Sequence, residues 1–291
     1  MSGPLPVCYL NGEYLPLKEA FVSPFDRAFL FGDAVYEVVP VYSGRPFRLR
    51  QHLDRLNRSL GGIRMLPPMS HGDWAHVCRE LISQNGADDA YLYMQVTRGA
   101  EFGRNHAWPE GLKPTLFAYC TELDPLPPAL LENGVAAVTA PEIRWERRDI
   151  KATSLLANIL LKKLASDAGA FETIMLENGE LTEGSSTTVH VIKNGVIHTP
   201  PNSHHILPGT TRDVVTELAD LLSIRNLSAP ITESTLRSAD EIWLAFSTRG
   251  LLPVTKLDGA PVGGGMPGPL FKRMYLAFTN YIRELKAQPA L

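Results

Sequence analysis

The stretch TEGSS at Thr182–Ser186 places one carboxylate, Glu183, directly before three small residues. Small residues let a planar ring approach the backbone, and a carboxylate beside that ring can pair with a pyridinium nitrogen. Taken alone, Glu183 is better explained as an exposed acid at the end of a strand. Together with Lys151, however, it predicts a Schiff-base cofactor site, because such a site needs an amine and an acid.

Lys151 stands out because the other lysines fall in turns, on the polar sides of helical patterns, or in loop-like or terminal sequence. We expect it just before a helix built on the apolar pattern of residues 155–164, with Thr153 or Ser154 as N-cap and Gly169 beyond its end. The positive end of that helix should favour the neutral amine that a nucleophile needs. A lysine that extends its amine into solvent is the alternative.

Length and composition indicate an ordinary globular protein. The chain has 291 residues, 44% of them hydrophobic and 20% charged, which is enough for one large domain or two smaller ones. A net charge of -3 and the lack of a Lys/Arg-rich tract argue against nucleic acid as a partner.

Three scattered cysteines, Cys8, Cys78 and Cys120, suggest neither a disulfide framework nor a metal site. The sequence near Met1 lacks the features of a signal peptide, and no apolar stretch is long enough to cross a membrane. We therefore expect no membrane association and a location in the cytoplasm.

The hydrophobic pattern predicts an α+β fold in two domains, residues 1–122 and 134–291, joined by a proline-dense linker at 123–133. In the first domain we expect hairpins at 7–15 and 34–49, helices at 51–60 and 73–84, and strands at 90–97 and 115–121. In the second we expect strands at 135–140, 172–176 and 241–246, a hairpin at 187–199, and helices at 211–222 and 269–285.

A phosphate site is predicted where Leu207–Arg212 (LPGTTR) opens an amphipathic helix. Free N–H groups at a helix start attract anions, and the hydroxyls of Thr210 and Thr211 can add hydrogen bonds. Thr248, in a loop directly after a predicted strand, is a second candidate contact. The alternative is that Thr210 or Thr211 is only an N-cap.

The stretch Gly263–Gly268 (GGGMPG) matches the dinucleotide fingerprint GxGxxG, but its context is wrong. A genuine fingerprint follows the first strand of a βαβ unit, whereas this one follows a turn and precedes the last predicted helix. An NAD-dependent oxidoreductase is therefore a distant alternative.

These motifs together resemble the fold type IV, or class IV, pyridoxal-phosphate-dependent aminotransferases. The segments that carry the resemblance cover nearly the whole chain in order: Asp26-Arg27, Phe31–Asp33, His52–Leu56 with Arg55, Ile150-Lys151, Thr182–Ser186, Gly209–Arg212 and Asp258-Gly259. The resemblance implies a two-domain fold of the D-amino-acid aminotransferase type, with pyridoxal 5'-phosphate between the domains.

The resemblance also implies a role for each site residue. Lys151 would hold the cofactor as a Schiff base and move a proton, and Glu183 would keep its ring protonated. The phosphate would be bound by Arg55, Thr210, Thr211 and Thr248, and the residues packed near the ring would be Ser186 and Leu207.

Within the family, Tyr36 and the stretch Arg104–His106 (RNH) look like the D-amino-acid aminotransferases. There, Tyr36, Arg104 and His106 would trap the substrate carboxylate, the last two acting across a homodimer interface. Without the family context, Arg104 and His106 would be interpreted as solvated loop residues.

This resemblance predicts transamination between a D-amino acid, such as D-alanine or D-glutamate, and a 2-oxo acid, pyruvate or 2-oxoglutarate. Thr188, where asparagine is expected, and Ala152–Ser154 depart from the D-specific pattern. A branched-chain L-amino-acid aminotransferase, an aminodeoxychorismate lyase and a non-catalytic pyridoxal-phosphate-binding homologue remain alternatives.

Overall fold

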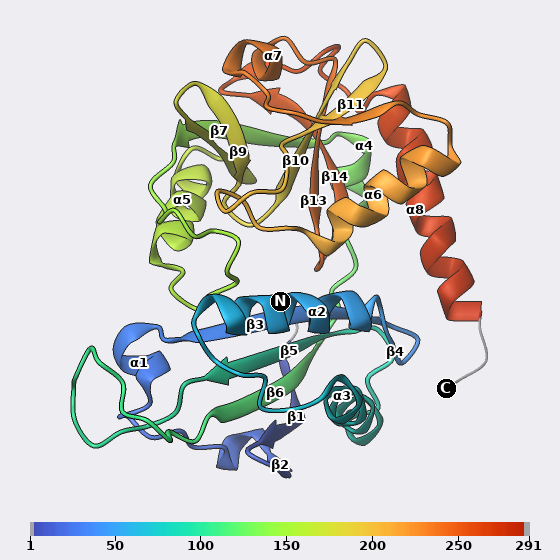
Figure 1. Ribbon diagram of the computed structural model, residues 1–291. Coiled ribbons are helices and arrows are strands. Elements are labelled where there is room, and N and C mark those ends of the chain that lie inside the picture. The colour runs from blue at the N-terminus through green and yellow to red at the C-terminus, as the bar shows by residue number, and fades with distance from the viewer. Residues whose placement is uncertain (1–2, 288–291) are drawn as a thin grey trace. The chain divides into compact units, whose positions relative to one another are not determined.

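The computed structural model describes residues 3–287 and divides them into two compact units (Figure 1). Unit 1 takes its described residues from Met1–Asp124, Ile150–Ser154 and Leu285–Leu291. Unit 2 comprises Pro125–Asp149 and Leu155–Glu284. The short segment that contains Lys151 therefore belongs to unit 1, although unit 2 supplies the chain on both sides of it.

Unit 1 is built on a six-stranded antiparallel sheet with the strand order β2-β1-β6-β5-β3-β4. The strands are β1 (Pro4–Leu10), β2 (Glu13–Pro16), β3 (Ala34–Tyr42), β4 (Arg45–Pro46), β5 (Ala90–Thr97) and β6 (Thr115–Glu122). Its helical elements are η1 (Leu17–Glu19), α1 (Arg27–Phe31), α2 (Leu49–Gly62) and α3 (His71–Asn85).

One face of this sheet is covered by α2 and α3, which also contact each other (Figure 1). The helix α2 turns a stripe at helical spacing inward, and it includes Leu53, Leu56 and Leu60. These side chains pack into a buried core with Trp74 of α3 and Leu92 of β5. Burying this apolar surface is the main force that holds the helices to the sheet.

The second strand of the 34–49 hairpin is shorter than the sequence predicts. The strand β4 ends at Pro46, and Leu49 already begins α2. Between them, Arg48 adopts the left-handed conformation, with φ 54°. That conformation cannot continue a strand, so the chain turns and Leu49 becomes the first residue of the helix.

Unit 2 contains a nine-stranded mixed sheet. Eight strands follow the order β12-β11-β10-β13-β14-β7-β8-β9, and β15 pairs with β14. Their bounds are β7 (Val135–Pro141), β8 (Glu172–Glu177), β9 (Glu180–Gly184), β10 (Thr188–Lys193), β11 (Val196–Thr199), β12 (Asn226–Ser228), β13 (Glu241–Phe246), β14 (Gly250–Leu257) and β15 (Ala260–Pro261). The pairs β11/β12, β14/β7 and β7/β8 are parallel.

The helices of unit 2 are α4 (Pro128–Glu132), α5 (Leu156–Asp167), α6 (Thr210–Leu221), α7 (Glu233–Arg237) and α8 (Pro269–Ala287), whose last residues belong to unit 1. In Figure 1, α5 lies beside β7 and β8, and α6 lies against β13. The glycine-rich stretch at residues 263–268 joins β15 to α8, so it does not follow the first strand of a βαβ unit.

Turns predicted from Asn-Gly and Asp-Gly pairs are found where the sequence places them. Asn11, Asn178, Asn194 and Asp258 each have a positive φ, between 48° and 53°, and each precedes a glycine with positive φ. The turn at Asn178 matters for function, because it leads from β8 into β9, the strand that carries Glu183. Within residues 3–287, no helix is both long and apolar enough to span a bilayer.

Candidate active site

Lys151 lies in a short extended segment that is bonded along the start of β3. Its carbonyl accepts a hydrogen bond from the backbone N–H of Tyr36 at 3.0 Å, and its own N–H donates to Ser59 Oγ at 3.1 Å. Its Nζ lies 4.2 Å from the centre of the Tyr36 ring. These two hydrogen bonds fix where the lysine side chain begins, and they place it beside Tyr36.

The expected N-cap of the following helix is wrong. The helix α5 begins at Leu156, its N-cap is Leu155, and no side chain caps it. Thr153 and Ser154 instead donate their hydroxyls to the carbonyl of Gly32, each at 3.2 Å. These long-range hydrogen bonds take the place of local capping.

Behind this segment lies a buried polar group on β3 and α2 that the sequence does not predict. Glu37 is fully buried and accepts two hydrogen bonds from Arg55, from Nε at 2.7 Å and from Nη2 at 2.8 Å. Its Oε2 also lies 2.7 Å from His52 Nδ1. Burial alone would raise the pKa of Glu37, but the Arg55 charge and the bonds from Arg55 and His52 hold it well below its usual value.

Arg55 is thus first of all the partner of a buried carboxylate. Its burial and its spacing of three residues from His52 on α2 explain why both side chains point to the same strand. A role for Arg55 in phosphate binding remains a prediction.

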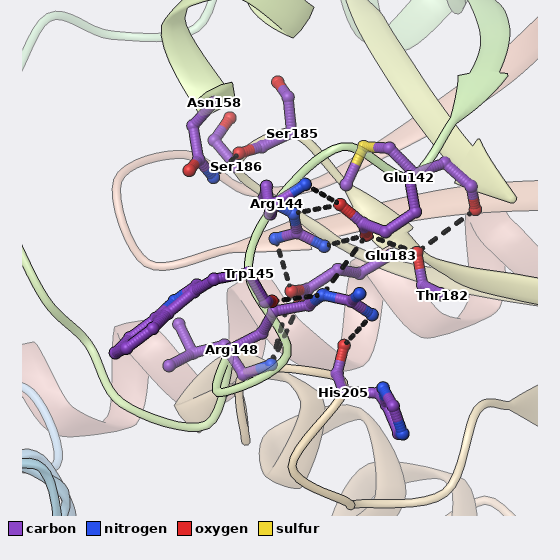
Figure 2. A network of polar contacts seen from close by, with 12 residues as sticks. Glu142, Arg144, Trp145, Arg148, Asn158, Thr182, Glu183, Ser185, Ser186 and His205 are labelled. Carbon is purple, nitrogen blue, oxygen red and sulfur yellow. Dashed lines mark hydrogen bonds and ion pairs between the residues drawn. The ribbon is translucent and has the colours of Figure 1, made fainter. Parts of the chain in front are cut away.

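Glu183 lies on β9 and is not the exposed strand-end acid that its sequence position alone suggests, since only 6% of it is exposed. Its Oε1 accepts a hydrogen bond from Arg144 Nη1 at 2.7 Å, and the N–H of Leu207 lies 3.3 Å from each carboxylate oxygen (Figure 2). Burial raises the pKa of Glu183, while the Arg144 charge opposes that rise. The site therefore presents a sheltered carboxylate that an arginine keeps in place.

Around Glu183 is a network of charges that the sequence analysis missed (Figure 2). Arg144 also donates two hydrogen bonds to Glu142, from Nε at 2.9 Å and from Nη2 at 2.6 Å. Arg148 binds Glu177 in the same bidentate way, at 2.7 and 3.0 Å. The sequence signal that could have indicated this network is the RWERR run at residues 144–148, which places three arginines within five residues.

Small residues after Glu183 are required by close packing. A Cβ on Gly184 would lie 2.0 Å from Thr187 Oγ1 and 3.1 Å from Glu172 Cγ, so only glycine fits there. Ser186 donates its hydroxyl to Glu172 Oε2 at 3.1 Å. The structure therefore explains the glycine, and a position of Ser186 near the cofactor ring remains a prediction.

The predicted anion site lies at the start of α6. Gly209 is the N-cap and no side chain caps the helix, so Thr210 and Thr211 are its first residues and not merely its caps. The first N–H groups of a helix have no partner within it, which suits them to a phosphate. Thr210 Oγ1 lies 3.3 Å from Ser247 Oγ, which brings the loop with Thr248 to this helix start.

One short backbone segment links the acid to the predicted anion site. Leu207, whose N–H contacts Glu183, precedes the first residue of α6 by only three positions. A buried carboxylate and a helix start are thus held at opposite ends of one short segment. This donor set fits a pyridine ring that carries a phosphate group.

Arg104 and His106 lie in the connection from β5 to β6, and both are exposed. The Arg104 guanidinium lies 5.1 Å from the centre of the Phe31 ring, and the His106 ring lies 5.6 Å from it. Among the described residues of unit 1, no contact joins this pair to Tyr36 or Lys151. Of the three predicted carboxylate-binding residues, Arg104 and His106 therefore lie together at Phe31, whereas Tyr36 lies beside Lys151.

A lysine, a buried acid and an anion-binding helix start are the parts of a pyridoxal-phosphate site, and comparison with known proteins gives the family. Residues 34–257 match the family model of amino-transferase class IV. D-alanine aminotransferase of Bacillus licheniformis is 38% identical over 94% of this chain and 95% of its own length. That of Staphylococcus aureus (strain MSSA476) is 38% identical over 95% of this chain and 98% of its own.

Solved structures agree on the fold. The branched-chain amino acid aminotransferase of Escherichia coli superimposes with a TM-score of 0.89 at 28% identity, covering 96% of this chain and 95% of that one. Another branched-chain enzyme, solved with pyridoxamine 5'-phosphate, gives 0.88 at 25% identity, with coverages of 96% and 94%. The chain belongs to the class IV aminotransferases, and its cofactor is pyridoxal 5'-phosphate. Its substrates are small amino and 2-oxo acids.

Proposed function

We propose that this protein transfers the amino group between a D-amino acid and a 2-oxo acid, with D-alanine and pyruvate as the first pair to test. The observation that carries the proposal is the 38% identity to D-alanine aminotransferases along nearly the entire chain. The Arg104–His106 stretch supports it, because both side chains lie at the Phe31 ring and the Arg104 guanidinium can bind a carboxylate.

When bound, pyridoxal phosphate supplies an aldehyde that joins to amines and a ring that withdraws electrons from the substrate Cα. Lys151 would hold it covalently. When free, the Lys151 amine would move a proton at the substrate Cα, a role worth about 10² to 10⁴ in rate.

Glu183 keeps the ring nitrogen protonated. A carboxylate can do this only while it is charged, and Arg144 favours the charged form of Glu183 against the effect of burial. The helix start at Thr210 and Thr211, with Thr248 and Arg55, would bind the phosphate. Ser186 and Leu207 would pack near the ring.

The substrate carboxylate is bound by Tyr36, Arg104 and His106. An arginine fork suits a carboxylate because two parallel N–H groups match its two oxygens. Where these groups hold the carboxylate decides which face of Cα meets Lys151, and hence the preference for one enantiomer. We further propose a cytoplasmic homodimer in which Arg104 and His106 act on the partner's substrate.

A half-reaction tests this function without a coupled assay. The purified holoenzyme is mixed with D-alanine or with L-leucine, and conversion of the cofactor is followed by its visible absorbance. Faster conversion by D-alanine supports the proposal. Faster conversion by L-leucine favours a branched-chain enzyme, the class to which the similar solved structures belong. If no amino acid converts the cofactor, the protein is a binding homologue without turnover.

A further inference from the structure

Arg27 is a buried guanidinium, 3% exposed, that holds the loop of Arg104 and His106 by its backbone. It lies at the start of α1, which Asp26 caps by accepting the N–H of Ala28. Its Nη1 donates to the carbonyl of Asn105 at 2.7 Å, and its Nη2 donates to the carbonyl of His106 at 3.2 Å. One side chain therefore binds two successive peptide groups of the loop.

Two carboxylates, Asp33 and Glu101, accept hydrogen bonds from Arg27. Asp33 accepts from Arg27 Nε at 2.9 Å, and Glu101, the first residue of the loop, accepts from Nη1. Asp33 also accepts two bonds from Arg98, at 2.8 and 3.0 Å. Since Asp33 is shared by two cations, Glu101 supplies the charge that balances Arg27. Buried arginines are stable only when they are paired in this way.

The base of the loop is also fixed. The N–H of Arg27 donates to the carbonyl of Gly99 at 2.9 Å, and a Cβ on Gly99 would lie 2.0 Å from the carbonyl oxygen of Lys113. The two ends of the connection are thus in close contact where it leaves the sheet. Arg98, which directly follows β5, also holds Trp108 at the end of the loop: its guanidinium lies 4.1 Å from the centre of the Trp108 ring.

Between these anchors the loop has little packing of its own. Residues 102–108 are exposed, so burial does not determine their position. Arg104 and His106 rest on Phe31, the last residue of the helix that Arg27 begins. The Arg27 bonds therefore hold the backbone from which the His106 side chain extends and the peptide next to Arg104.

We propose that Arg27 and Glu101 are positioning residues that hold the loop of residues 101–108 in the form that binds the substrate carboxylate. This rests on the proposed role of Arg104 and His106. The pair acts on substrate affinity and leaves the cofactor site unchanged, because its contacts are with the loop, α1 and Asp33.

The test uses the holoenzyme with Glu101→Gln, which removes the charge and keeps the shape, and Arg27→Lys, whose single nitrogen with three donors cannot replace the four bonds of the planar guanidinium. Glu110→Gln is the matched control, since Glu110 is exposed, lies in the same connection and loses the same charge. We expect KM for both D-alanine and pyruvate to rise about tenfold in each anchor variant, with kcat within about threefold of the parent. Amide hydrogen exchange at residues 102–108 should become faster.

Each readout can overturn the proposal. It is wrong if Glu101→Gln matches Glu110→Gln in both KM and loop exchange, or if kcat falls while KM stays constant. Arg104→Gln separates this failure from that of the proposed function. If Arg104→Gln raises KM and Glu101→Gln does not, only the anchor is refuted; if Arg104→Gln leaves KM unchanged, the carboxylate role falls and the anchor proposal with it. If the Glu101→Gln variant has the same unfolding temperature as the parent protein, global misfolding is excluded as the cause of a change in KM.

Discussion

Replacing Arg144 with methionine tests how this protein keeps Glu183 charged. The guanidinium lies 2.7 Å from Glu183 Oε1, and both side chains are 8% exposed, so solvent screens the interaction little. An opposite charge at this range lowers a carboxylate pKa by about 1 to 3. Its loss should raise the pKa of Glu183 by the same amount, starting from a value that burial has already raised.

The effect on the rate follows from this change. A pKa difference of about 1 to 3 corresponds to about 1.4 to 4 kcal/mol between the charged and neutral forms of Glu183. If the ring depends on the charged form, kcat should fall most at pH values below the pKa of Glu183, where the loss can reach about 10- to 1000-fold. The charged form is lost as pH falls through the pKa, so the acid limb of the kcat profile should move to higher pH.

The assay is kcat for D-alanine and pyruvate across the range from mildly acidic to alkaline pH, with Arg144→Met compared to Arg144→Lys and Arg147→Met. Arg144→Lys keeps the charge and should shift the acid limb less. Arg147 pairs with Asp149 at the surface in the same loop, so its variant controls for the loss of one arginine. An acid limb that stays in place in Arg144→Met would refute the reasoning, whatever happens to the maximal rate.

Two further changes probe the supporting structure. Glu37→Gln removes a buried charge that is paired with Arg55, so the free energy of unfolding measured with urea should fall by about 3 to 5 kcal/mol, whereas a loss below about 1 kcal/mol would contradict the assigned pair. Because the pKa of Glu37 lies below its ordinary value of 4.5, its contribution to stability is present above that pH and is lost as pH falls further; the variant should therefore be less sensitive to acid. Gly209→Ala places a Cβ 2.7 Å from Thr188 Oγ1 and should weaken pyridoxal phosphate binding about tenfold in a fluorescence titration; adding Thr188→Ala should restore most of it, and a lack of rescue would show that the clash lies elsewhere.

Much of the architecture follows from local signals. Asn178-Gly179 forms a turn because asparagine and glycine accept positive φ, and residues 241–246 form the predicted strand because an apolar run is bounded by polar sequence. The helix α3 begins with the reciprocal bonds of Ser70 and Asp73, although the sequence pattern places its start two residues too late, at Asp73. Local chemistry thus predicts which elements exist better than where they begin.

Long-range contacts account for what was missed. Thr153 and Ser154 look like helix caps, but they bind the carbonyl of Gly32, more than a hundred residues earlier. Arg144 and Glu183 are likewise far apart in the chain, and nothing in a sequence alone pairs one arginine with one acid. For the site, residue types and spacing predict Lys151, Glu183 and the start of α6, whereas the groups that adjust their charge emerge only from the fold.

Borohydride reduction of the holoenzyme tests the central claim most directly, because it makes the bond between the cofactor and its lysine permanent. After trypsin digestion, the phosphopyridoxyl label should be found by mass spectrometry in the peptide of residues 149–162, since a labelled Lys151 resists cleavage. The Lys151→Ala variant should carry no label. A label on any other lysine, or none in the parent protein, would contradict the account.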